Sequence, residues 1–242
     1  MKNNIQLVGF LTMFRKEVNR VFRIWRQTLL PPVITMTLYF LIFGKFIGNR
    51  VGSMQGFSYM EFIVPGLIMM SIITNSFGNV VSAVFGSRFQ KNIEEVLISP
   101  LRKSVLLLGF LSGGIVRGFL VGMLVVIVAM FFAPIKIYHW GIFLFTTMLT
   151  TLLFGLGGFI NSVFAKRFDD INLIPIFVLT PLTYLGGVFY SIKMLPEFWQ
   201  NVSLLNPVLY LVNVYRYAFL GISDINVYVA LGCVVFVVVL LW

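Results

Sequence analysis

Long apolar runs alternate with short polar connections along most of the 242-residue chain. A helix needs roughly 20 apolar residues to cross a hydrocarbon core about 30 Å thick. By this measure we expect six transmembrane helices, at Thr28–Phe46, Phe62–Val84, Val105–Phe132, Trp140–Phe164, Ile171–Phe189 and Ile225–Trp242. The pattern predicts an all-α membrane protein in which residues 1–242 form one transmembrane domain.

Prolines predict local backbone features in two of these spans. Pro31 and Pro32 suit the first turn of the first span, where a missing backbone N–H costs little. Pro175 and Pro181 lie inside the fifth span, which should therefore be kinked or locally unwound.

Residues 5–26, before the first span, form a different kind of helix. Apolar residues from Phe10 to Trp25 recur every three or four positions, and basic residues occupy the opposite face. Such a helix suits the headgroup plane beside anionic lipid. We expect an interfacial helix that stays in the mature protein, with membrane lipids among its partners.

Composition and charge agree with this picture. A chain that is 59% hydrophobic and 11% charged, with a mean hydropathy of +0.97, is far more apolar than a soluble domain. The net charge of +10 does not indicate nucleic acid, because the basic residues gather at the ends of the spans. With the N-terminus in the cytoplasm, twelve basic residues lie on the cytoplasmic side and five on the other. The positive-inside rule therefore places both termini in the cytoplasm.

The connection at residues 88–100, between the second and third spans, reads as a short amphipathic helix. Phe89, Ile93 and Val96 share one face, and charged residues take the other. Pro100 disfavours helical geometry at Ser99 and should end the helix there. Spacing alone fits a solvated loop helix as well as a docking element for a soluble partner.

The segment at residues 190–221 does not read as a span, because charged residues and prolines interrupt its apolar character. Irregular backbone is tolerated at membrane depth only where protein or a water-filled cavity surrounds it. We expect short re-entrant helices here that dip into the outer leaflet.

Polar and small residues mark individual faces of the spans. A stripe at helical spacing runs down the second span, and it must face protein or a wet cavity; hydrogen bonding between helices and a substrate path both account for it. Its members are Ser71, Asn75, Gly78, Asn79 and Ser82. In the third span Gly114, Gly118 and Gly122 form a ridge that favours close packing within the bundle. Arg117 lies among them, at a cost of about 2.5 to 3.5 kcal/mol, so it should snorkel to the headgroups or pair with an acidic group.

The strings "IEEVLISPLRKSVLLLG" and "FVLTPLTYLGGVFYSIKMLPEFWQNVSLLNPVLYLVNVYRYAFLG" resemble those of the export-type permeases of the ABC-2 family. These permeases are the membrane half of bacterial ATP-binding-cassette exporters, and the resemblance covers nearly the whole chain. It implies a homodimer in the bacterial inner membrane, joined to two copies of an ATPase subunit that drives export. In the family, the helix after the second span is the coupling helix that rests on the ATPase.

The resemblance also implies roles for three groups of residues. ATPase docking falls to Arg88, Lys91, Glu94, Glu95, Ser99 and Pro100. The substrate path is bordered by Ser71, Asn75, Asn79, Ser82, Thr180, Thr183 and Tyr184. The outer gate comprises Pro196, Trp199, Asn206, Pro207 and Arg216. Family members usually carry basic residues after the last span, so we expect the final helix to end early at Trp242 or the sequence to continue beyond it.

No G-x-x-x-x-G-K-[ST] phosphate loop occurs in the sequence. We therefore expect no enzymatic activity on this chain, no metal and no cofactor, with ATP and Mg bound by the partner subunit. Asp169 and Asp170 could suggest a metal or an acid/base pair, but turn chemistry and helix capping explain them better. An ATP-independent channel or secondary transporter and an intramembrane scaffold are the alternatives. The lack of carboxylates inside the spans disfavours ion coupling.

Overall fold

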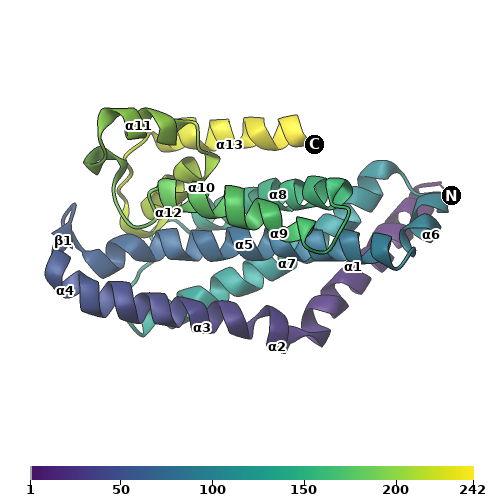
Figure 1. The fold of residues 1–242 in the computed structure, drawn as a ribbon, viewed down its shortest axis with the longest axis horizontal. Coiled ribbons are helices and arrows are strands. Elements are labelled where there is room, and N and C mark those ends of the chain that lie inside the picture. Colours follow the sequence, from purple (N-terminus) through teal and green to yellow (C-terminus); the bar gives the residue numbers. More distant parts are fainter. Residues whose placement is uncertain (1) are drawn as a thin grey trace.

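The computed structural model describes residues 2–242 and consists of helices that run mostly side by side (Figure 1). Four helical segments are long and apolar enough to cross a membrane: Trp25–Gly44, Tyr59–Phe89, Lys103–Met130 and Trp140–Phe164. They correspond to the first four predicted spans. The segments predicted as the fifth and sixth spans form shorter apolar helices, Asp170–Leu185 and Val227–Leu241, so the structure supports four of the six predicted spans by length and composition.

The N-terminal fifth of the chain is a series of consecutive helices. It consists of α1 (Lys2–Arg23), α2 (Trp25–Thr28), α3 (Leu30–Tyr39), the π-helix η1 (Phe40–Ile47) and α4 (Gly48–Val51). The prolines at 31 and 32 lie in the first turn of α3, as predicted.

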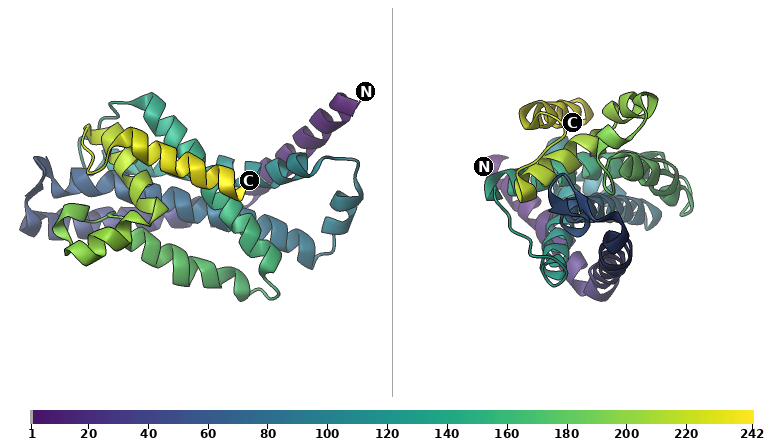
Figure 2. Two further views of the ribbon diagram at one scale, coloured as in Figure 1. Left: turned by 90° about the horizontal axis from the view of Figure 1, so that it is seen from above. Right: turned by 90° about the vertical axis from the view of Figure 1, so that its left-hand side faces the viewer.

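The face that α1 buries differs from the predicted one. Met13, Glu17 and Val21 are its buried side chains, whereas Phe22 and Trp25 beyond them remain about half exposed. The helix packs on α7 (Lys103–Met130), where Gly109 and Gly113 leave room for Met13 and Glu17. Its N-terminal end points away from the bundle (Figure 2). Helical periodicity alone did not reveal that a neighbouring helix, in addition to lipid, covers part of α1.

A small hairpin that the all-α prediction missed precedes the second span. Strands β1 (Ser53–Met54) and β2 (Phe57–Ser58) pair antiparallel, and Gln55 and Gly56 turn between them with φ of 51° and 86°. Two positive φ angles are typical of a type I′ turn. Ser58 then caps the start of α5 (Tyr59–Phe89) with a capping box. Its hydroxyl accepts from the backbone N–H of Glu61, and the Glu61 carboxylate accepts from the backbone N–H of Ser58.

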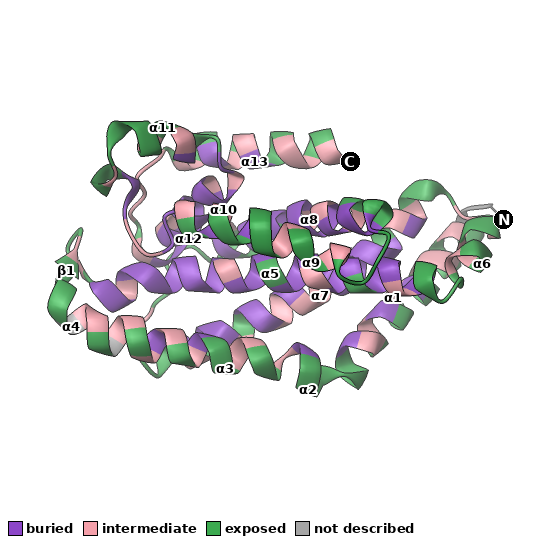
Figure 3. Ribbon diagram, viewed as in Figure 1, coloured by how far each residue is buried: buried purple, intermediate pink, exposed green. Residues whose placement is uncertain are grey.

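The core lies between α5 (Tyr59–Phe89), α7 (Lys103–Met130) and α8 (Trp140–Phe164). The central helix α5 is the most buried of the three, as its colouring in Figure 3 shows. The glycine ridge of α7 packs within this bundle, as predicted. A Cβ at Gly114 would lie 2.6 Å from Val80, and one at Gly122 would lie 2.9 Å from Ile72.

The fifth predicted span is locally unwound, as its prolines indicated. It consists of α9 (Asp170–Ile174), a π-helical turn η2 (Pro175–Leu179) and α10 (Thr180–Leu185). The carbonyl of Pro175 accepts from both the backbone N–H and the hydroxyl of Thr180, the latter over 3.0 Å.

The segment from 190 to 221 forms short helices, as predicted: the 3₁₀ turn η3 (Ile192–Met194), α11 (Glu197–Leu204) and α12 (Pro207–Leu220). Of these, α12 is almost wholly buried against α5, α8 and the last helix, α13 (Val227–Leu241), whereas α11 is mostly exposed. This segment therefore supplies both a core helix and a surface helix at the end of the molecule that carries the hairpin.

Candidate functional site

The predicted docking helix is shorter than residues 88–100. Helix α5 continues through Phe89, so Arg88 lies in its last turn. Lys91 then adopts a φ of 60°, a left-handed conformation that ends helices. The short helix α6 runs only over Ile93–Ile98, and Ser99 is extended before Pro100, as predicted.

The two faces of α6 have different surroundings. Ile93 and Val96 are partly buried and pack against the apolar cluster around α7 and α8. Glu94 and Glu95 are exposed on the other side, and Leu97 and Ile98 are 65% and 84% exposed. Within a single chain, α6 therefore presents two carboxylates and two large apolar side chains without cover.

The segment that follows α6 is attached to α1. The side-chain amide of Gln6 donates to the carbonyl of Pro100 over 2.9 Å and accepts from the backbone N–H of Arg102 over 2.9 Å. Leu101 packs against Gly9 on the same helix. Through these contacts α6 and the N-terminal helix are held together at one end of the bundle.

Arg88, one of the predicted docking residues, is exposed and also binds its own chain. Its guanidinium donates to the carbonyls of Ser162, Val163 and Ala165 at the C-terminal end of α8. A positive group at a helix C-terminus satisfies free carbonyls and complements the helix dipole. In this structure Arg88 therefore fixes the end of α5 to the end of α8.

The polar stripe of α5 divides between two environments. Ser71, Asn75 and Asn79 are buried, whereas Ser82 is exposed and donates to the carbonyl of Gly78 in its own helix. The amide of Asn75 donates to the carbonyl of Ser71, and its oxygen accepts from Arg117 over 2.8 Å. Of the buried members, Asn75 makes a hydrogen bond between helices, whereas the hydroxyl of Ser71 and the amide nitrogen of Asn79 are buried without a hydrogen-bond partner.

Arg117 therefore contacts an amide and not a carboxylate. The sequence predicted that an acidic partner or snorkelling would compensate the buried charge of Arg117. The contact with Asn75 is neither of these. Among the described side chains, no Asp or Glu lies within ion-pairing distance of Arg117.

The predicted path residues of the fifth span also have different positions. Thr180 and Tyr184 are exposed, whereas Thr183 is buried and donates to the carbonyl of Thr180. The ring of Tyr184 stacks on that of Phe189, with centroids 5.8 Å apart. Open surface on this helix is thus limited to Thr180, Tyr184 and their apolar neighbours.

Sequence analysis did not single out the buried carboxylate of Glu17. Its side chain lies between α1 and α7, 1% exposed, and pairs with Arg20 over 3.0 Å. Arg20 also donates to the carbonyl of Asn79 and so links α1 to α5. Burial raises the pKa of Glu17 above its ordinary value of 4.5, and the positive charges of Arg20 and Lys16 only partly oppose this. The four-residue spacing from Met13 through Glu17 to Val21 was the signal available in the sequence.

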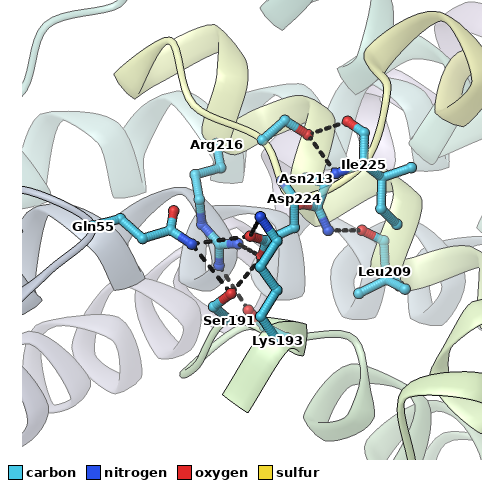
Figure 4. A network of polar contacts seen from close by, with 10 residues as sticks. Gln55, Ser191, Lys193, Leu209, Asn213, Arg216, Asp224 and Ile225 are labelled. Atoms are coloured by element: carbon cyan, nitrogen blue, oxygen red, sulfur yellow. Dashed lines mark hydrogen bonds and ion pairs between the residues drawn. The ribbon is translucent and has the colours of Figure 1, made fainter. Parts of the chain in front are cut away.

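A second buried carboxylate, Asp224, organises the opposite end of the molecule (Figure 4). Its oxygens accept from Ser191 over 2.8 Å and from Gln55 over 2.9 Å, and they lie 3.8 Å and 3.7 Å from the cationic groups of Lys193 and Arg216. These residues come from the hairpin turn, the segment after α10, α12 and the linker before α13. Sequence analysis did not single out Asp224 because it resembles an ordinary turn residue.

Arg216, predicted to belong to the outer gate, lies inside this network and is 1% exposed. Its guanidinium donates to the carbonyl of Gly187 over 2.8 Å and lies 3.9 Å from the ring centre of Phe62. Arg216 on α12 therefore makes buried contacts with α5 and with the segment that follows α10.

The other predicted gate residues lie at helix starts or on the surface. Asn206 caps α12 by accepting from the backbone N–H of Val208 and also donates to the carbonyl of Leu182, while Pro207 occupies the first turn. Pro196 precedes α11, on which Trp199 is 45% exposed. The structure thus brings Asn206 and Arg216 onto one buried helix and leaves Trp199 outside.

The two aspartates at 169 and 170 serve a turn. The carboxylate of Asp170 accepts from the backbone N–H groups of Lys166 and Arg167, both over 2.9 Å. Asp169 precedes α9 without a capping hydrogen bond. Within residues 2–242, no group of three or more His, Cys, Asp or Glu side chains is placed to hold a metal ion.

These features define a multi-pass α-helical membrane protein with a short, uncovered helix between its second and third spans. The family model described as ABC-2 type transporter matches residues 8–220. The chain belongs to the ABC-2 type transporter family, which confirms the resemblance inferred from its motifs. Membership makes it a membrane permease component and implies an ATPase subunit as its partner.

Curated relatives agree with this assignment. The chain is 54% identical over 232 residues to inner membrane transport permease YadH of Escherichia coli strain K12, covering 96% of this chain and 91% of the relative. It is 24% identical over 241 residues to nodulation protein J of Rhizobium leguminosarum bv. viciae, covering 96% and 90%. Both likenesses extend over nearly the full length of each protein.

Proposed function

We propose that this chain is the membrane-spanning subunit of an exporter in the bacterial inner membrane. ATP and Mg bind to a separate ATPase subunit, and the chain itself catalyses no reaction. Two copies of the chain and two ATPase subunits form the complex, with six spans per chain and both termini in the cytoplasm. The name of the Escherichia coli relative supports the inner-membrane location, and family membership supports the ATPase partner.

The observation that carries this proposal is the uncovered surface of α6. Glu94, Glu95, Leu97 and Ile98 are exposed on a helix whose other face is anchored in the bundle. Isolated apolar side chains at a surface are ordinary, but next to two carboxylates on an anchored projection they suit a protein partner. We assign ATPase docking to this face. Lys91, Ser99 and Pro100 shape the turns on either side, and Arg88 holds the end of α5 in place.

The substrate path is assigned to surface that a single chain leaves open. Three members of the predicted path are exposed: Ser82 on α5, and Thr180 and Tyr184 on α10. Ser71, Asn75 and Asn79, the other predicted path residues on α5, are buried in the single chain. Pairing of two chains across this face would enclose a path between them, along which ATP-driven closure alternates access.

Co-purification with the ATPase encoded beside this chain tests the docking assignment. The double substitution Glu94→Ala with Glu95→Ala removes both carboxylates from α6. We expect it to reduce recovery of the ATPase and ATP hydrolysis by the complex by about tenfold, the scale of a lost charge-assisted contact.

The matched control is Asp169→Ala with Glu197→Ala, which removes the same charge from two exposed positions elsewhere on the chain. This variant should keep wild-type recovery of the ATPase. Equal recovery with both double variants would contradict docking at α6.

A further inference from the structure

A cavity of about 330 Å³ opens between the first span and the core, next to Arg117. The first span contributes Gln27, Pro31 and Thr35, α5 contributes Ser71 and Asn75, and Arg117 enters from α7. The cavity therefore combines one cationic group with several hydroxyl and amide groups on three separate helical segments.

The guanidinium of Arg117 is incompletely satisfied by the described chain. One of its terminal nitrogens donates to Asn75, but its Nε is buried without a hydrogen-bond partner. The hydroxyl of Ser71, on the same wall, is also buried without a partner. Buried polar groups are normally hydrogen-bonded, so two orphaned groups on one cavity indicate a missing ligand.

The charges around Arg117 do not balance. The buried carboxylate of α1, Glu17, is paired with Arg20 over 3.0 Å. No carboxylate of the described residues pairs with Arg117. The charge of Arg117 is therefore unbalanced within this chain, and an anionic oxygen ligand would balance it.

Apart from Thr74, the remaining lining of the cavity is mostly apolar. Pro31, Pro32, Met36, Tyr39 and Met70 continue the wall along the first span and α5. A small hydrated anion would leave this surface empty, whereas an amphiphile with an anionic headgroup would cover it. The flexible side chains of Met36 and Met70 suit an alkyl chain of variable shape.

We propose that this cavity binds an amphiphile with an anionic headgroup. The phosphate or carboxylate oxygens accept from Arg117 and Ser71, and the alkyl chain lies along Pro31, Met36 and Met70. Such a ligand is either a bilayer lipid that stays bound or an amphiphile that the protein transports. The binding itself requires no ATPase and stands independently of the proposed docking at α6.

Lipid retention by the purified chain tests the site. The protein is exchanged into detergent with phosphatidylglycerol or with phosphatidylcholine of the same acyl chains, and bound lipid is counted by native mass spectrometry. We expect retention of phosphatidylglycerol by the wild type, about tenfold weaker retention in Arg117→Gln, and substantial recovery in Arg117→Lys.

Two further variants separate this site from nonspecific charge and from misfolding. Arg23→Gln removes the same charge from an exposed position on α1 and should retain phosphatidylglycerol like the wild type. Thr35→Trp fills the cavity from an exposed position on α3 without changing the charge, and it should lose retention. Equal retention in Arg117→Gln, Thr35→Trp and the wild type, or equal retention of both lipids by the wild type, would overturn the proposal.

The source of the ligand is distinguished by adding the ATPase. A resident lipid stays bound through rounds of ATP hydrolysis, whereas a transported amphiphile is released in proportion to the ATP consumed. Either result supports the site. If no ATPase associates, the retention arm still decides the proposal, so its failure and that of the proposed function are distinguishable.

Discussion

At the scale of single residues, the burial of Glu17 has a direct consequence for pH dependence. Its carboxylate is enclosed between α1 and α7, and the cost of desolvating the charge exceeds the attraction of Arg20 and Lys16, so its pKa is raised. The folded state therefore binds this proton more tightly than the unfolded chain does.

We expect the thermal unfolding midpoint of the detergent-purified protein to fall as the pH rises from 4.5. The contribution is fully present below the unfolded pKa of about 4.5 and is lost as the pH rises through the higher folded pKa. Glu17→Gln keeps the shape of the side chain but cannot titrate, and it should flatten this part of the profile. The measurement is the unfolding midpoint against pH for both proteins.

Glu197→Gln is the control for the pH experiment, because Glu197 is exposed on α11. Its profile should follow that of the wild type. A profile for Glu17→Gln with the same slope as the wild type would show that the burial of Glu17 does not set the pH dependence.

At the scale of elements, the crossing of α5 and α8 depends on glycine. A Cβ at Gly158 would lie 2.6 Å from the backbone carbonyl oxygen of Phe77, a contact that backbone atoms cannot relieve without shifting the helix. Close approach of this kind is what small residues allow between membrane helices.

We therefore expect Gly158→Ala to lower the free energy of unfolding by about 1 to 3 kcal/mol, the usual cost of overpacking. Gly141, on the same helix, has no atom within 4 Å of an added Cβ. Gly141→Ala should be neutral or stabilising by up to about 1 kcal/mol, because alanine favours helix. Denaturant unfolding in mixed micelles compares the two variants, and equal losses of stability would contradict the proposed clash.

At the scale of the whole molecule, the exposed edge of α5 bears on assembly. Along this edge Thr74 and Ser82 are exposed, and an added Cβ at Gly78 or Gly86 meets nothing within 4 Å. The edge is therefore open in the single chain, although α5 is otherwise the most buried spanning helix. The proposed homodimer pairs across this surface.

Disulfide crosslinking tests this pairing. The chain has one cysteine, Cys233, and its replacement by Ala gives a background without reactive thiols. In that background Ser82→Cys should form a disulfide-linked dimer under mild oxidation. Val239→Cys, 68% exposed on α13, should remain monomeric on a denaturing gel. Crosslinking at Val239 and not at Ser82 would place the interface on the other side of the molecule.

The sequence predicted the features that depend on local patterns. The bounds of α8 agree with the prediction at both ends, because an apolar run that begins at Trp140 and ends at Phe164 has polar or turn-forming neighbours on each side. Pro175 predicted the local unwinding that takes the form of a π-helical turn between α9 and α10, because proline removes a backbone donor wherever it occurs.

Features that depend on distant neighbours could not be predicted. The sequence did not show that Arg88, a predicted docking residue, also binds the end of a helix more than 70 residues later in the chain. The hydrogen bond between Asn75 and Arg117 joins positions 42 residues apart, and its acceptor is an amide where an acid was expected. Periodicity identifies a polar face, but it does not show which side chain of another helix will meet that face.

The hydrogen bonds at the two ends of the segment from α9 to α10 suggest how this segment responds to force. The amide of Asn161 donates to the carbonyl of Ile171 at one end, and the amide of Asn206 donates to the carbonyl of Leu182 near the other. Between these points the π-helical middle carries Ile176 and Phe177, which are 59% and 71% exposed. The segment is therefore attached to neighbouring helices near both ends, and a π-helical turn lies between the two attachments. Leu179, at the end of the same turn, is 5% exposed and packs in the core, so bending of this middle would be passed on to the core.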